Sequence, residues 1–89
     1  MVVGGWSTLR EITGDDKEVF EKALSEFVGV TFEPLLVETQ VVSGIKYRFI
    51  CNAATVTAEP VKYAAVVTVW SKSDGIVEIA DIAKFNDLF

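Results

Sequence analysis

The spacing of apolar positions changes once along this chain, from helical to strand-like. Between 15 and 29 the apolar residues recur three to five positions apart, which predicts one helix with an apolar stripe. Asp15 with Glu18 predicts a capping box at its start, with Thr13 as the alternative cap, and Gly29 is expected to end it. The stripe comprises Val19, Phe20, Ala23, Leu24, Phe27 and Val28.

After the helix, residues typical of strands fill four runs: 30–42, 45–56, 62–71 and 75–85. In the second run apolar and polar residues alternate, as in a half-buried strand, with Ile50 as an exception. Short turn-like segments join the runs, and antiparallel pairing follows because parallel strands need long crossovers. The last run also fits helical spacing, and a short strand within 7–12 would extend the sheet.

One helix and one sheet each have an apolar face that the other can cover. The 89 residues fit a single small domain, 1–89, and a hydrophobic fraction of 51% is ample for its core. The sequence therefore predicts an α+β domain, in which a single helix is wrapped by a four- to five-stranded antiparallel β-sheet.

Composition argues against several classes of function. The net charge of −5, without a basic cluster, makes nucleic acid an unexpected partner, and charges interrupt the apolar stretch 45–70, so no membrane span is expected. The chain has no histidine, and Asp15 and Asp16 suit a helix cap better than a metal site. We therefore expect no enzymatic activity, no metal and no cofactor.

A single cysteine, Cys51, excludes an intramolecular disulfide and is expected to be a small buried residue. A secreted domain of this size is usually cross-linked, so a reducing, cytoplasmic compartment is favoured. The first residues also lack the basic and long apolar regions of a signal peptide.

Two segments rich in small residues flank the helix and the first strand. Val2-Val3-Gly4-Gly5 lies near the start, and Gln40-Val41-Val42-Ser43-Gly44 has the form Q-x-V-x-G where two strands should meet in a hairpin. Neither segment holds a nucleophile, a general base or a metal ligand, which suits insertion into another protein's cleft. Taken singly, they read as a flexible terminus and an ordinary hairpin turn.

In this order and at this spacing, the two segments and the helix resemble the cystatin superfamily of papain-like cysteine protease inhibitors, over nearly the whole chain. The size and the lack of disulfides are most similar to the intracellular stefin type. The resemblance implies a reversible, tight-binding inhibitor that fills the protease cleft with a wedge. Val2 and Val3 would occupy apolar subsites, and Gly4 would stand where the chain turns away from the catalytic cysteine, with Gly5 next to it in the protease-binding strip. Gln40 to Gly44 would form the first loop at the centre of the cleft.

The second loop departs from the family pattern. Many secreted cystatins carry Pro-Trp there, and stefins a Leu-Pro-His-like segment, whereas this chain has Ser71-Lys72-Ser73-Asp74-Gly75. Ser73 and Asp74 would make the third contact, with Trp70 either beside them or pointing into the sheet, while Trp6 is expected to pack on the domain. This departure leaves open a non-inhibitory cystatin-fold binding or structural protein. The architecture also implies a monomer that can form an inactive domain-swapped dimer by straightening the first loop.

Overall fold

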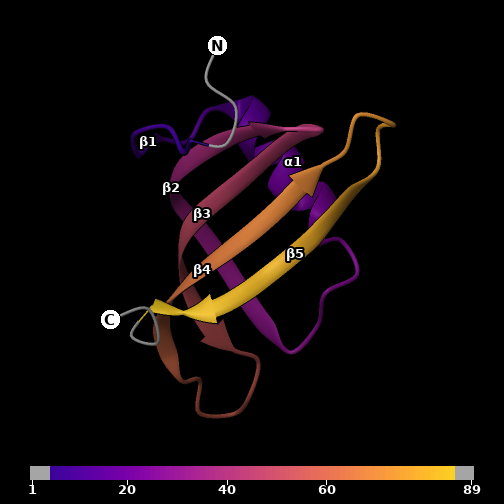
Figure 1. Ribbon diagram of the computed structural model, residues 1–89. Coiled ribbons are helices and arrows are strands. Elements are labelled where there is room, and N and C mark those ends of the chain that lie inside the picture. Colours follow the sequence, from indigo (N-terminus) through magenta and orange to yellow (C-terminus); the bar gives the residue numbers. More distant parts are fainter. Residues whose placement is uncertain (1–4, 86–89) are drawn as a thin grey trace.

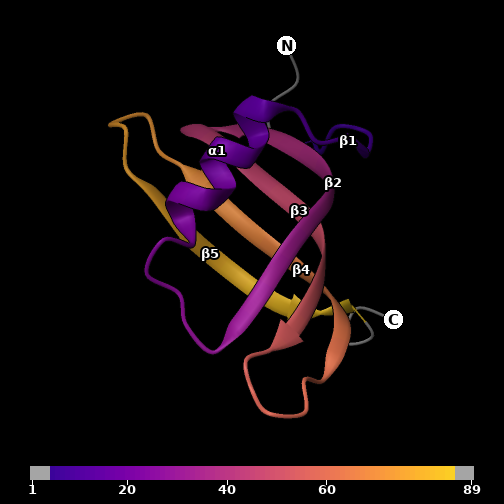
Figure 2. The same ribbon diagram turned by 180° about the vertical axis from the view of Figure 1, so that it is seen from behind.

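The computed structural model describes residues 5–85, in which one helix lies across one face of an antiparallel sheet (Figure 1). The helix α1 spans Gly14–Ala23, and Figure 2 shows it from its own side of the sheet. The five strands are adjacent in chain order: β1 (Arg10–Glu11), β2 (Val30–Val42), β3 (Gly44–Thr55), β4 (Lys62–Ser71) and β5 (Val77–Lys84). This confirms the α+β prediction of a single helix against an antiparallel sheet and is consistent with a cystatin-like fold.

The strands lie where the runs of strand-prone residues predict them. β2 and β4 have the predicted bounds, and β3 and β5 differ from prediction by at most two residues. The last run is a strand rather than a helix, because it pairs with β4 and sets Ile82 beside Val67. The extra strand expected within 7–12 is β1, whose two residues pair with Leu36 and Val37 of β2.

The structure decides between the two caps that the sequence offered for the helix. Thr13, not Asp15, is the N-cap residue, and its hydroxyl accepts a hydrogen bond from the Asp16 amide at 3.3 Å. In return the Asp16 carboxylate accepts one from the Thr13 amide at 2.9 Å. The capping box is therefore formed by Thr13 and Asp16. Of the two acidic residues expected to serve a cap, Asp15 and Asp16, the expectation is confirmed for Asp16.

The helix is also shorter than predicted, ending at Ala23 instead of 29. Just beyond its end, the Ser25 hydroxyl donates to the Lys22 carbonyl at 3.2 Å, a local bond that competes with another helical turn. Gly29 has a φ of 94° and leads into β2 rather than capping α1, and Val28 is 85% exposed instead of buried. Within residues 5–85, no helix combines the length and the apolar character needed to cross a membrane.

The core lies between α1 and the central strands. Phe20 of α1 meets Phe49 of β3 edge to face, with ring centroids 4.8 Å apart. Around this pair pack four residues that are at most 1% exposed: Val37, Cys51, Val67 and Val69. Cys51 is thus a small core residue as predicted, and burial raises the pKa of its thiol to about 12.

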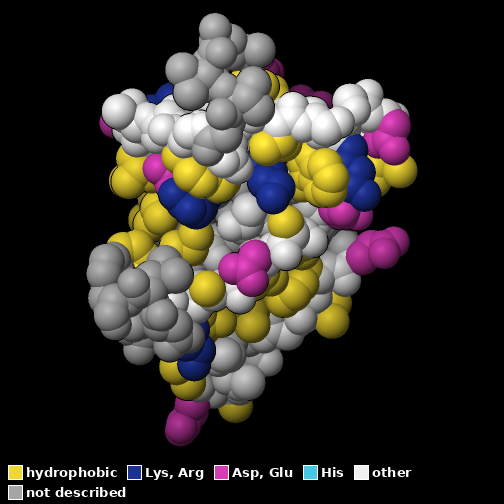
Figure 3. All heavy atoms as spheres, in the orientation of Figure 1, with side chains coloured by type: hydrophobic (Ala, Val, Ile, Leu, Met, Phe, Trp, Pro, Cys, Tyr) yellow, Lys and Arg dark blue, Asp and Glu magenta, His cyan; other side chains and the backbone are white. Residues whose placement is uncertain are grey.

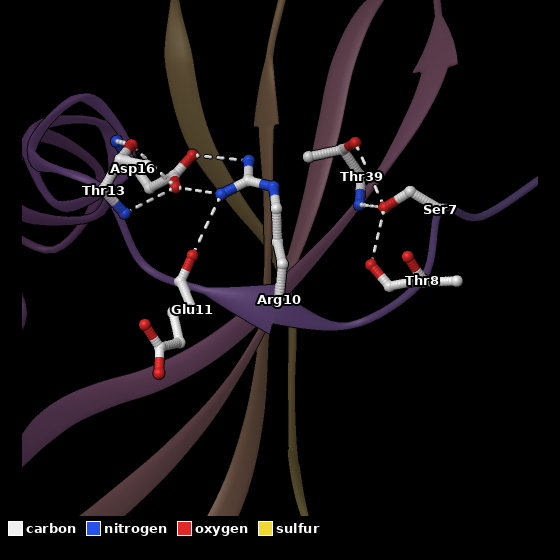
Figure 4. A network of polar contacts seen from close by, with 7 residues as sticks. All are labelled: Ser7, Thr8, Arg10, Glu11, Thr13, Asp16 and Thr39. Carbon is white, nitrogen blue, oxygen red and sulfur yellow. Dashed lines mark hydrogen bonds and ion pairs between the residues drawn. The ribbon is translucent and has the colours of Figure 1, made fainter.

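Asp16 is the one charged residue found buried between residues 5 and 85, and a polar network satisfies it (Figure 4). Two Arg10 nitrogens donate to its carboxylate oxygens at 2.5 and 3.0 Å, and the Thr13 hydroxyl donates at 2.9 Å. These bonds, foremost the one from Arg10, lower the pKa of Asp16 from 3.8 to about 2. Because Arg10 belongs to β1, the network ties the first strand to the start of the helix.

Asp16→Asn should lower the free energy of unfolding at pH 7 by about 2 kcal/mol, since it removes the carboxylate that pairs with the partly exposed Arg10 and accepts the capping bond from the Thr13 amide. Asp15→Asn, at the exposed neighbouring position, should cost less than about 1 kcal/mol. Urea unfolding of both variants and of the wild type measures this.

The pH dependence of that loss provides a second check. A depressed carboxyl pKa stabilises the fold above the pKa of the unfolded state, and the stabilisation disappears as pH falls through the folded-state value. The difference between the wild type and Asp16→Asn should therefore shrink between about pH 4 and pH 2. A difference that stays constant over this range would contradict the role given to the Asp16 charge.

Candidate functional site

Three segments that are distant in sequence meet at one end of the sheet (Figure 1). Ser43 alone joins β2 to β3, while residues 72–76 join β4 to β5. The N-terminal segment runs alongside the first hairpin through an antiparallel bridge between Trp6 and Gln40. We call residues 5–6, 40–44 and 72–76 together the tip edge.

The first hairpin is mostly strand. Val41 pairs with Ile45 and Val42 with Gly44, so only Ser43 stands at the apex. Gly44 has a φ of 93°, and a Cβ at this position would lie 2.2 Å from the Ser71 carbonyl oxygen. The motif therefore needs glycine for two reasons: the backbone is left-handed there, and the end of β4 occupies the space of a side chain.

The second hairpin is closed by hydrogen bonds of its own. The Lys72 amide donates to the Ile76 carbonyl at 2.8 Å, and the Gly75 amide donates to the Lys72 carbonyl at 3.0 Å. The Asp74 carboxylate accepts from the Ile76 amide at 3.0 Å, a bond typical of turns. Ser73 and Asp74 are exposed at its apex, and Asp74 is already engaged in holding the turn.

The two hairpins contact each other. The indole nitrogen of Trp70 donates to the Ser43 carbonyl at 2.9 Å, and the Ser43 and Ser73 hydroxyl oxygens lie 3.3 Å apart. Trp70 precedes the loop on β4, and its neighbour Val69 is fully buried on the helix side. Trp70 is half-buried on the opposite face, so the alternative in which it points into the core is wrong.

Trp6 packs on the open face of the sheet beside the first hairpin. The Arg48 guanidinium lies 4.0 Å from the centre of its ring, and Arg48 is also ion-paired with Glu38. The next residue, Ser7, exchanges hydrogen bonds with Thr39: its amide donates to the Thr39 carbonyl at 2.8 Å, and its hydroxyl accepts from the Thr39 amide at 2.9 Å (Figure 4). The expectation that Trp6 packs on the domain is confirmed.

The structure brings together all the predicted site residues that it describes, namely Gly5, Gln40, Val41, Val42, Ser43, Gly44, Ser73 and Asp74. Val2, Val3 and Gly4 lie outside the described residues. The sequence did not identify Trp70, Lys46 and Lys72 as a group around the first hairpin. A signal was present for Trp70, because the buried Val67 and Val69 place it on the other face by alternation.

The tip edge, as far as it is described, consists mostly of small, apolar and hydroxyl-bearing residues. It offers valine side chains, serine hydroxyls and backbone amides, whereas the thiol of Cys51 lies in the core with a pKa of about 12 and stays protonated. Comparisons of the chain with protein-family models, with curated proteins and with solved structures find no match. The resemblance to cystatins thus stands on the motifs and on the α+β fold.

The close packing at Gly44 can be tested against a glycine of the same conformation. Gly44→Ala and Gly75→Ala both place a side chain at a φ near 92°, a strain of about 1–2 kcal/mol. A Cβ at Gly75 meets open space, whereas one at Gly44 collides with Ser71. Gly44→Ala should therefore lower the free energy of unfolding by at least about 2 kcal/mol more than Gly75→Ala, measured by urea denaturation. Equal losses of unfolding free energy in the two variants would show that the backbone around Gly44 can shift to accommodate a Cβ at little cost.

Proposed function

We propose that this protein is a reversible, tight-binding inhibitor of papain-like cysteine proteases, whose tip edge and preceding N-terminal residues fill the active-site cleft. The observation that carries the proposal is the meeting of three segments. The bridge from Trp6 to Gln40 and the contact from Ser43 to Ser73 hold the N-terminal segment and both hairpins at one end of the sheet. Such an edge has the order of parts that the cystatin resemblance implies for a wedge.

Inhibition on this proposal is obstruction rather than chemistry. The loop of the first hairpin is a single residue, Ser43, so the hairpin ends in a tight turn, and its flanking valines supply apolar surface for a cleft. Gly4 and Gly5 let the backbone pass the catalytic cysteine closely, since glycine has no Cβ. Val2 and Val3 then fill apolar subsites, and burial of a valine contributes roughly 1.5–3 kcal/mol. With no peptide bond presented to the nucleophile, the inhibitor leaves the complex intact.

The second hairpin makes the smaller contribution. Its exposed apex consists of Ser73 and Asp74, and Asp74 is held by the Ile76 amide. Ile76, the last residue of that loop, is its one large apolar side chain and is 54% exposed. Affinity on this proposal depends mainly on the N-terminal residues and the first hairpin.

The polar apex of the second hairpin favours a second candidate function, a non-inhibitory cystatin-fold binding or structural protein. On this alternative the tip edge would bind a partner that is not a protease, and papain would retain its activity. Under either proposal the protein works without catalysis or cofactor. We also propose a cytoplasmic monomer, in keeping with its one buried cysteine, that can exchange α1 and β2 with a second copy.

Papain should be inhibited reversibly with a nanomolar or lower inhibition constant, and the protein should be recovered uncleaved. Interfaces of about 1,600 Å² reach this affinity when their parts are preorganised. Titration of papain activity, followed by mass spectrometry of the recovered inhibitor, provides the measurement. Full papain activity at about ten micromolar protein, far above that constant, would support the non-inhibitory alternative instead.

A matched pair of substitutions locates the inhibitory surface. Val42→Ser changes the first hairpin and should raise the inhibition constant about tenfold or more, through loss of apolar burial. Val56→Ser makes the same change after β3, at the opposite end of the sheet, where Val56 is 64% exposed. It should leave inhibition unchanged. If both variants inhibit as the wild type does, the first hairpin is not the contact surface.

Removal of residues 1–4 should weaken papain binding by about 3 kcal/mol or more, because two valines are lost. The melting temperature should hardly change, since the contacts of Trp6 and Ser7 with β2 lie after the cut. Inhibition assays and thermal unfolding of the truncated protein test both expectations. A large fall in melting temperature with unchanged affinity would assign these residues a structural role.

A further inference from the structure

Ser43, the apex of the first hairpin, is held by two side chains from the second. The Trp70 indole nitrogen donates to its carbonyl at 2.9 Å, and the Ser73 hydroxyl lies 3.3 Å from its own. Next to it, Gly44 lies so close to the end of β4 that a Cβ would stand 2.2 Å from the Ser71 carbonyl and 2.9 Å from the Lys72 Cα. Backbone and side chains of β4 and its loop thus support both residues at the tip.

Trp70 is itself fixed in orientation. Two ammonium groups lie over its ring, that of Lys46 at 5.7 Å and that of Lys72 at 5.0 Å from the ring centre. Lys72 is held in turn by Glu78, at 2.9 Å. Figure 3 shows dark blue and yellow side chains alternating across this face near the tip edge. Cation–aromatic contacts of this kind favour one ring position and keep the indole N–H directed at Ser43.

We propose that Trp70 is a positioning residue for the first hairpin. It fixes Ser43 relative to the second hairpin, so that both tips meet a partner as one preorganised edge. The proposal deepens the inhibitor function and rests on it for the affinity argument. The Ser43 carbonyl is exposed, so Trp70 supplies from the neighbouring strand a fixed donor where water would otherwise bind.

Preorganisation affects binding because a mobile tip must be ordered when it enters a cleft. A direct contact residue would lose only its own interaction with the protease on substitution, and the free inhibitor would be unchanged. A positioning residue differs, since its loss increases the mobility of Ser43 and Gly44 before any protease is present. This difference allows the two roles to be separated.

The test is Trp70→Phe, which retains an aromatic face for both lysines and removes the indole N–H donor together with the larger ring of the indole. Backbone ¹⁵N relaxation of the free protein should show increased mobility at Ser43 and Gly44, with the rest of β3 unchanged. The inhibition constant for papain should rise about tenfold, the equivalent of one lost hydrogen bond. The control is Tyr63→Phe at the far end of β4, whose ring lies 5.3 Å from Lys84 in a similar contact. It should change neither readout.

Each outcome decides the question. Weaker inhibition by Trp70→Phe with an unchanged tip would make Trp70 a direct contact, and a mobile tip with full inhibition would make its positioning irrelevant to binding. Both results overturn the proposal while the inhibitor function stands. If the wild type does not inhibit papain, the proposed inhibitor function is wrong. The relaxation measurement then still tests whether Trp70 restricts the mobility of Ser43. Should Trp70→Phe not fold, Ser73→Ala removes the other contact with Ser43 and is expected to loosen the same two residues.

Discussion

Phe20 and Phe49 pack edge to face with their centroids 4.8 Å apart, and this contact decides which face of the sheet the helix covers. Side chains on a strand alternate between faces, so burying Phe49 places its neighbour Arg48 on the open face. Because Phe49 pairs with Val67, the register also fixes which side chains of β4 face the helix. Val67 and Val69 are fully buried on that side, and Trp70 is not. The position of Trp70 beside Ser43 thus depends on a core contact near the middle of the domain.

The sequence predicted the strands well because local rules govern them. Strand-prone residues fill each run and turn-like segments separate the runs, so the bounds of β2 and β4 followed directly, while alternation marked the buried face of β3 and β4. The helix was harder to bound. Two overlapping capping boxes compete at its start, and the deciding partner of Asp16 is Arg10, which lies outside the helix. At its end Phe27 continues the apolar spacing, yet it packs on Phe32 from a turn.

The site shows the same division between local rules and tertiary contacts. Q-x-V-x-G at a hairpin was predictable because turns favour glycine, and the φ of Gly44 agrees with this. That Gly44 also has no room for a Cβ could not be predicted, because the obstructing atoms belong to Ser71 and Lys72 on another hairpin. Similarly, alternation gives the face of Trp70 but not the hydrogen bond to Ser43, which depends on how far each hairpin extends.

The contacts at the tip edge also bear on the proposed exchange of α1 and β2 between copies. Exchange requires β2 and β3 to join as one strand through Ser43, so Gly44 would leave its φ of 93° for an extended conformation. The hydrogen bond from Trp70 and the contact with Ser73 would be lost at the same step. The β-branched Val42 favours the extended form, whereas these contacts favour the turn. The features that would shape the tip for a protease cleft are therefore the ones that would hold the chain as a monomer.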